Sequence, residues 1–184
     1  RDRFRSQAES WALRTLRPRG LFLCGGDISK TMEARYSVYQ NDHGNLIPKE
    51  FAFSIDNVRP LTWNPWNCIH EGEKEVWTLA KLVGVIRSDH TFRRDFDARL
   101  DSLLAEKRIW VRQSDGYLTA CPDQLPTVEW TSARETINAR LERDGFVERA
   151  LSVLNGAGYK AWRNPVGHLA VDGAAATALN PASV

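Results

Sequence analysis

The sequence is poor in cysteine and has no long apolar run. Its three cysteines, Cys24, Cys68 and Cys121, are odd in number and far apart, without a Cys-x-x-Cys pair. This spacing argues against a disulfide framework or a zinc finger, and it is typical of free thiols in a reducing cytosol. The chain lacks a run of about 18 apolar residues, so no transmembrane helix is predicted. The opening RDRFRSQAES lacks the apolar core of a signal peptide, and we expect a cytoplasmic location.

Lysine is also scarce, with 6 Lys against 19 Arg in a chain of net charge +2. Arginine binds phosphate and carboxylate groups through two parallel hydrogen bonds, so this excess favours anionic partners. A genome of high GC content produces the same bias without any functional cause. Both interpretations stay open.

Familiar catalytic motifs are missing. The sequence has no Gly-x-Ser-x-Gly nucleophile motif, and CGGDISK is not a full Gly-x-x-x-x-Gly-Lys-Ser/Thr loop. Gly25 and Gly26 in that stretch are still candidates for nucleotide binding, because glycines let backbone amides approach a phosphate. A tight turn is the alternative. The histidines His43, His90 and His168 are scattered and form no metal-ligand pattern.

The length of 184 residues and the 42% content of hydrophobic residues predict one domain. We expect an α+β fold over residues 1–172, with short antiparallel strand pairs and about four or five helices. A weakly ordered tail is expected at 173–184.

Periodicity and turn signals place the elements along the chain. Helices are predicted at 3–16, 73–87, 91–107 and 131–159. A buried strand at 21–24 enters a glycine turn, another strand covers 51–59, and hairpins are predicted at 36–47, 109–120 and 159–171. In the first helix, one face carries Phe4, Ala8, Trp11, Ala12 and Leu16. In the last, Gly145 interrupts the helix and Ser132 with Glu135 forms a capping box.

The segment 91–120 combines a charged amphipathic helix with a hairpin. Thr91 is the expected cap of this helix, and its core face carries Phe92, Phe96, Leu100, Leu103 and Leu104. Helices 73–87 and 91–107 with hairpin 109–120 resemble the last part of a winged helix, a DNA-binding fold. The acidic residues of the helix argue against that interpretation, because carboxylates repel the DNA phosphates.

Arg93, Asp97 and Asp101 are spaced i, i+4, i+8, with Arg94 beside them. Two carboxylates one helical turn apart are able to hold a divalent metal for phosphodiester hydrolysis, while arginines grip the phosphate. Asp97, Asp101 and Arg93 are therefore the catalytic candidates, and Arg94 is a candidate for DNA or nucleotide binding. The same spacing also produces ordinary ion pairs on a solvated face.

The loop WNPWNCIHEGE brings Trp63, Trp66 and His70 together. Tryptophans in a loop are able to stack on a base, and the histidine suits a role as a base or metal ligand. All three are candidates for nucleotide or DNA binding. The alternative is that both rings fill the edge of the core.

Three stretches carry a likeness that extends over nearly the entire chain: RDRFRSQAESWALRTLRPRGLFLCGGD, WNPWNCIHEGEKEVWTLAKLVG and RRDFDARLDSLLAEKRIWVRQSDGYLTACPDQLP. Read together, they resemble the plasmid fertility inhibition factors, among them the oncogenic suppression proteins. The resemblance rests on whole-chain likeness and not on one motif. It implies a ParB/sulfiredoxin-like α+β fold in a bacterial, plasmid-encoded protein.

The same resemblance implies a function. Such proteins block transfer of plasmid DNA or T-DNA through a type IV secretion system, and the implied activities are a DNase and an ATPase. DNA, ATP, a divalent metal such as Mg²⁺, and secretion components or the transferred DNA–protein complex are the implied partners. The sequence departs from the family pattern of a Gly-rich turn followed by a basic pair, since Ile28 follows Asp27. A DNA-binding regulator without catalysis and a non-catalytic inhibitor of a secretion component remain as alternatives.

Overall fold

The computed structural model describes residues 2–27, 34–59, 74–107, 110–112, 118–120 and 127–177. Its centre is a five-stranded antiparallel sheet in the order β1-β2-β3-β7-β6. The strands are β1 (Leu21–Asp27), β2 (Ala34–Asp42), β3 (Asn45–Phe53), β6 (Ala161–Arg163) and β7 (Leu169–Asp172). A separate antiparallel ribbon joins β4 (Trp110–Arg112) to β5 (Leu118–Ala120). The predicted α+β class is confirmed.

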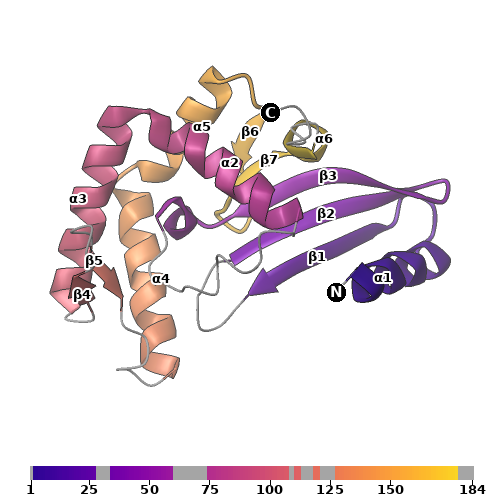
Figure 1. Ribbon diagram of the computed structural model, residues 1–184, viewed down its shortest axis with the longest axis horizontal. Helices are drawn as coiled ribbons and strands as arrows, with labels where there is room; N and C mark the ends of the chain where they lie inside the picture. The colour runs from indigo at the N-terminus through magenta and orange to yellow at the C-terminus, as the bar shows by residue number, and fades with distance from the viewer. Residues whose placement is uncertain are drawn as a thin grey trace.

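Six α-helices and one 3-10 helix lie within the described ranges, against the four or five helices expected. They are α1 (Asp2–Thr15), η1 (Ile55–Val58), α2 (Lys74–Ser88), α3 (His90–Lys107), α4 (Thr127–Arg143), α5 (Phe146–Gly156) and α6 (Gly173–Thr177). Helices α2 to α5 gather toward one end of the sheet, and α1 lies at the other end (Figure 1). The tail that was expected to be weakly ordered from 173 onward begins with α6.

The long hairpin predicted around residues 36–47 is confirmed as β2 and β3. Its turn places His43 and Gly44 at positive φ, 48° and 95°, and the Asn41 side chain accepts a hydrogen bond from the Gly44 amide at 2.9 Å. Glycine and turn-forming polar residues tolerate this conformation. The prediction of a separate strand at 51–59 was wrong, because β3 continues to Phe53 and η1 follows it.

Helix ends differ from the predicted ones in two places. Asp89 rather than Thr91 caps α3, because its carboxylate accepts a hydrogen bond from the Phe92 amide at 2.8 Å. The proposed capping box was also wrong, since α4 begins at Thr127 and Ser132 lies inside it. Gly145 separates α4 from α5 as predicted, in a left-handed conformation with φ 81°.

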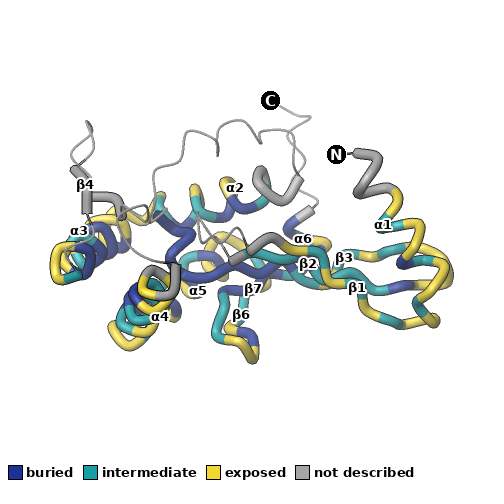
Figure 2. The backbone as a smooth tube through the Cα atoms, turned by 90° about the horizontal axis from the view of Figure 1, so that it is seen from below, coloured by how far each residue is buried: buried dark blue, intermediate teal, exposed yellow. Residues whose placement is uncertain are grey.

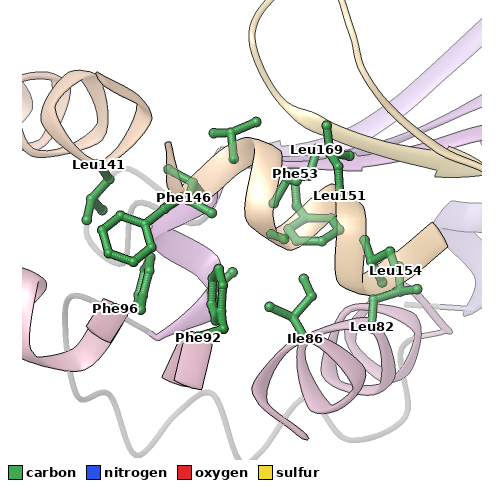
Figure 3. Close-up of a cluster of buried hydrophobic side chains, with 14 of the residues drawn as sticks. Phe53, Leu82, Ile86, Phe92, Phe96, Leu141, Phe146, Leu151, Leu154 and Leu169 are labelled. Carbon is green, nitrogen blue, oxygen red and sulfur yellow. The ribbon is translucent and has the colours of Figure 1, made fainter. Parts of the chain in front are cut away.

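The hydrophobic core lies between one face of the sheet and helices α2 to α5 (Figure 3). All five side chains that the periodicity assigned to the core face of α3 are buried. The Phe92 and Phe96 rings stack with their centroids 5.5 Å apart. The Phe146 ring of α5 meets both edge-on, at 5.8 and 5.2 Å. Such aromatic pairs stabilise a core beyond the area that they bury.

The two faces of the sheet have different surroundings. Phe51 and Phe53 of β3 point into the core, so the residues that alternate with them point to the second face. Strand pairing places Leu21, Leu23, Val38, Ile47 and Glu50 on this second face. In Figure 2, α2 lies over one face, and the connection between β6 and β7 projects from the other. Leu21 and Leu23 remain 61% and 63% exposed, so β1 is not the buried strand that the sequence predicted.

We predict that Phe96→Ala lowers the free energy of unfolding by about 3–5 kcal/mol, because the variant leaves a cavity between two aromatic rings. Equilibrium unfolding in urea measures this change. Val166→Ala is the control, since its side chain is 66% exposed and such surface changes stay within about 0.5 kcal/mol. Equal stability of the two variants would contradict the packing of α3.

Candidate functional site

The predicted catalytic carboxylates of α3 lie in a network of ion pairs. Both guanidinium Nη atoms of Arg87 donate to the Asp97 carboxylate at 2.9 Å. Arg59 donates from Nη2 to Asp101 Oδ1 at 2.5 Å and lies 3.7 Å from Asp97 Oδ1. Arg59 and Asp97 are buried, at 7% and 8% exposure. The two carboxylates therefore join α3 to α2 and to the end of η1.

Arg93 takes no part in this network. Its guanidinium lies 3.1 Å from His90 Nδ1, and Arg94 bonds the neighbouring Asp95 at 3.0 and 2.9 Å. The expected grouping of Arg93 with Asp97 and Asp101 is thus not present. Both arginines are exposed.

The other flank of α3 is also occupied. Arg149 of α5 bonds Asp95 at 3.0 Å, and Asp144 accepts from Arg99 at 2.6 Å. A winged-helix recognition helix inserts one long face into the major groove. Because α3 packs through its core face and pairs along both flanks, it leaves only a narrow surface for that role.

Gly25 and Gly26 do not form the expected turn. Both lie inside β1, where Gly25 pairs with Tyr36 and Gly26 pairs with Arg35. A Cβ atom on Gly25 would lie 2.6 Å from the Tyr36 Cβ, so the close approach of two strands explains this glycine. A paired strand does not present the concave row of amides that binds phosphate. The candidates Trp63, Trp66 and His70 lie outside the described residues.

A polar cluster that the sequence did not predict lies on the second face of the sheet. Asn164, in the β6–β7 connection, donates through Nδ2 to the Tyr36 hydroxyl and to Glu50 Oε1, the latter at 3.0 Å. The Tyr36 hydroxyl also donates to Glu50 at 3.3 Å. Asn164 Oδ1 accepts from the His168 amide at 3.0 Å, and the His168 ring lies 5.9 Å from the Tyr36 ring.

A second group of polar side chains lies between η1 and α4. Arg134 donates from Nε to Asp56 Oδ2 at 2.6 Å and from Nη2 to the Ser54 hydroxyl at 3.3 Å. Ser54 also bonds Asp56, and Asn57 donates to the Ser54 hydroxyl at 2.8 Å. Asp56, Arg134 and Glu50 all act on the ionisation of His168, so the two groups form one electrostatic unit. We call Tyr36, Glu50, Asp56, Arg134, Asn164 and His168 the sheet-face cluster.

Burial controls the ionisation of this cluster. It lowers the pKa of His168, while the carboxylates of Asp56 and Glu50 act to raise that pKa and Arg134 acts to lower it. His168 Nδ1 is buried without a hydrogen-bond partner among the described residues. Burial and the nearby Glu50 carboxylate raise the pKa of Tyr36. The lowered pKa keeps the histidine neutral at neutral pH.

The members of this cluster are far apart in the sequence, which explains why no motif revealed them. Tyr36 and Glu50 come from the first hairpin, Arg134 from α4 and His168 from the last hairpin. The one local signal is Asn-Pro-Val-Gly-His at 164–168, a turn sequence that ends in a titratable residue. The pairing of β3 with β7 brings these residues together.

The arrangement supplies an imidazole together with an arginine and two carboxylates close enough to act on its ionisation. Arginine with a neutral imidazole suits acid–base chemistry on a phosphate ester. Within the described residues, no group of three or more His, Cys, Asp or Glu side chains is placed to hold a metal ion. We therefore assign no metal ligand among the described residues.

Neither a protein-family profile, nor a curated protein, nor a solved structure matches this chain. Among the helices in the described ranges, none is long and apolar enough to cross a membrane.

We predict that Asp97→Asn destabilises the protein by on the order of 3 kcal/mol, because it removes a buried carboxylate that Arg87 and Arg59 share. Thermal and urea unfolding measure the loss. Asp95→Asn is the matched control on the same helix, because its carboxylate pairs with the more exposed Arg94 and Arg149, and a much smaller loss is expected. If Asp97→Asn is as stable as that control, the network is not structural.

We predict that His168 makes stability depend on pH in a known direction. The unfolded histidine gains a proton near pH ~6.5, whereas burial resists that proton in the folded state. Stability should therefore fall as pH drops below about 6.5, and the effect should be absent above it. His168→Gln should reduce this fall and His43→Gln should not, because the His43 side chain is 86% exposed. Urea unfolding at about pH 7.5 and about pH 5.5 measures the loss of stability in each variant. An equal loss in the two variants would contradict the burial of His168.

Proposed function

We propose that this protein is a plasmid-encoded fertility inhibition factor with a ParB/sulfiredoxin-like fold, which stops the transfer of DNA through a type IV secretion system. Its proposed action is hydrolysis of the transferred DNA, regulated by ATP. The sheet-face cluster supports this proposal, because arginine, carboxylate and imidazole groups from four separate segments meet there. An enzyme requires such a convergence, whereas a purely structural sheet does not.

Each member of the cluster has a proposed role. Hydrolysis of a phosphodiester needs a base that takes a proton from the attacking water, and a donor that stabilises charge on the phosphate. His168 is the proposed base, acting through Nε2. Arg134 is the proposed phosphate donor, oriented by its bond to Asp56. Asn164 and Tyr36 hold Glu50 and the β6–β7 connection in place.

The cluster has little positive charge of its own. Arg134 is paired with Asp56, and Glu50 adds a further carboxylate. A polyanionic substrate must therefore be held mainly by other parts of the surface. The proposed use of ATP rests on the resemblance, since Gly25 and Gly26 lie in a paired strand.

A second candidate function is inhibition by binding a protein of the secretion machinery without catalysis. The apolar side chains exposed on the second sheet face favour it: Leu21, Leu23 and Ile47 lie there, at 61%, 63% and 39% exposure. Exposed apolar patches of this kind mark protein interaction sites. The two candidates share the outcome, a block of DNA transfer, and differ in whether DNA is cut.

The test is degradation of labelled single- and double-stranded DNA by the purified protein, with and without ATP and Mg²⁺. We expect cleavage, a rate that changes with ATP, and a loss of about a hundredfold or more in His168→Gln. His43→Gln and Asp101→Asn should cut at the wild-type rate, because neither residue belongs to the cluster. If the wild-type protein cuts no DNA, the non-catalytic candidate replaces this one; if only Asp101→Asn loses cleavage, the active site lies at α3.

A further inference from the structure

Trp11 is exposed at the end of the molecule opposite the helical core. The sequence predicted Trp11 and Ala12 on the same face of the first helix, but the Trp11 side chain is 60% exposed and Ala12 is fully buried. Tryptophan is large and apolar, and an exposed one is commonly part of a binding surface. Trp11 is the largest of the exposed apolar side chains in the described ranges.

Three arginines follow Trp11 in the sequence. Arg14 lies one helical turn after Trp11, and Arg17 and Arg19 follow in the Arg-Pro-Arg-Gly stretch that ends α1. All three are exposed. Arg14 bonds the Ser10 carbonyl oxygen at 3.2 Å. The structure shows neither an ion pair nor a hydrogen bond from the guanidinium of Arg17 or Arg19 to any described residue.

The segment that carries these arginines is rigidly held. The Arg19 amide donates to the Asn41 carbonyl at 2.7 Å, and the Asn41 amide donates to the Gly20 carbonyl at 2.8 Å. The Asn41 side chain donates to the Leu16 carbonyl at 2.9 Å, and Gln40 donates to the Arg19 carbonyl at 3.2 Å. Arg19 itself adopts φ 67°, a conformation that non-glycine residues keep only where the surroundings impose it.

The charged side chains of residues 10–26 are all arginines. Glu9 precedes Trp11 in α1, and Asp42 of the adjoining turn lies 4.0 Å from His43 Nε2. Cations without acidic partners, placed beside an exposed aromatic ring, match a phosphate backbone with unstacked bases.

We infer that Trp11, Arg14, Arg17 and Arg19 form a binding surface for single-stranded nucleic acid. The tryptophan ring stacks on a base, and the arginines contact successive phosphates. The choice of this ligand rests on the proposed action on DNA, and the surface supplies the positive charge that the sheet-face cluster lacks. Glu50 lies five residues along β3 from Asn45 at the turn end, a span of about 17 Å along the strand.

The experiment measures the affinity of the purified protein for a fluorescently labelled oligothymidylate by anisotropy, over a range of salt concentrations. Trp11→Ala should weaken binding between about fivefold and about 150-fold, and Trp11→Phe should restore most of the affinity. Arg14/Arg17/Arg19→Ala should reduce the slope of log affinity against log salt by about 2, the change expected for three lost phosphate contacts on a single strand. The matched triple variant Lys49/Arg143/Lys160→Ala removes the same charge from exposed residues elsewhere and should keep the wild-type slope.

The possible outcomes separate this inference from the proposed function. His168→Gln should bind oligothymidylate like the wild type, so binding without cleavage supports the surface even where the proposed nuclease fails. Equal losses in the two triple variants would overturn the inference, because affinity would then follow net charge alone. Binding to vesicles that contain phosphatidylserine, without binding to oligothymidylate, would also overturn it and assign the surface to a membrane.

Discussion

The packing of α3 against the Phe146 ring of α5 is the constraint on which the rest of the structure depends. Phe92 and Phe96 are almost fully buried, at 1% and 0% exposure, and their position fixes the rotation of the helix. That rotation directs Asp97 toward Arg87 and Arg59, and Asp95 toward Arg149. Asp97 and Asp101, which resemble a catalytic pair in the sequence, thereby join α3 to Arg87 of α2 and to Arg59 after η1. A buried charge needs a partner, so packing determines their role before any chemistry does.

The sequence predicted the fold best where the signal was local. The core face of α3, the turn at His43 and Gly44 and the break at Gly145 follow from periodicity and from backbone freedom at particular residues. It failed where a neighbouring residue competes for the same role, or where a distant segment decides. Thr91 was expected to cap α3, but the carboxylate of Asp89 accepts the hydrogen bond from the Phe92 amide. Gly25 resembles a turn residue, yet it lies in a strand whose partner approaches too closely for a side chain.

The candidate site was beyond sequence reasoning for the same reason. Glu50 and His168 are separated by more than half of the chain, and only the pairing of β3 with β7 joins their neighbourhoods. Each residue taken alone has an ordinary interpretation, as a strand carboxylate and a turn histidine. Burial lowers the pKa of His168 against the opposing effect of Glu50, and burial together with Glu50 raises the pKa of Tyr36; periodicity does not reveal that burial.

The arginines at the two ends of the sheet differ in whether a carboxylate pairs with them. Where catalysis is proposed, arginine is already shared with a carboxylate, which orients the guanidinium but reduces its attraction for a polyanion. At the opposite end, the arginines after α1 lack such partners among the described residues, so their full charge faces solvent. In the function that we propose, one end of the sheet would attract a strand of nucleic acid and the other end would cleave it. Affinity and bond cleavage would respond to different substitutions, which a site combining both functions would not allow.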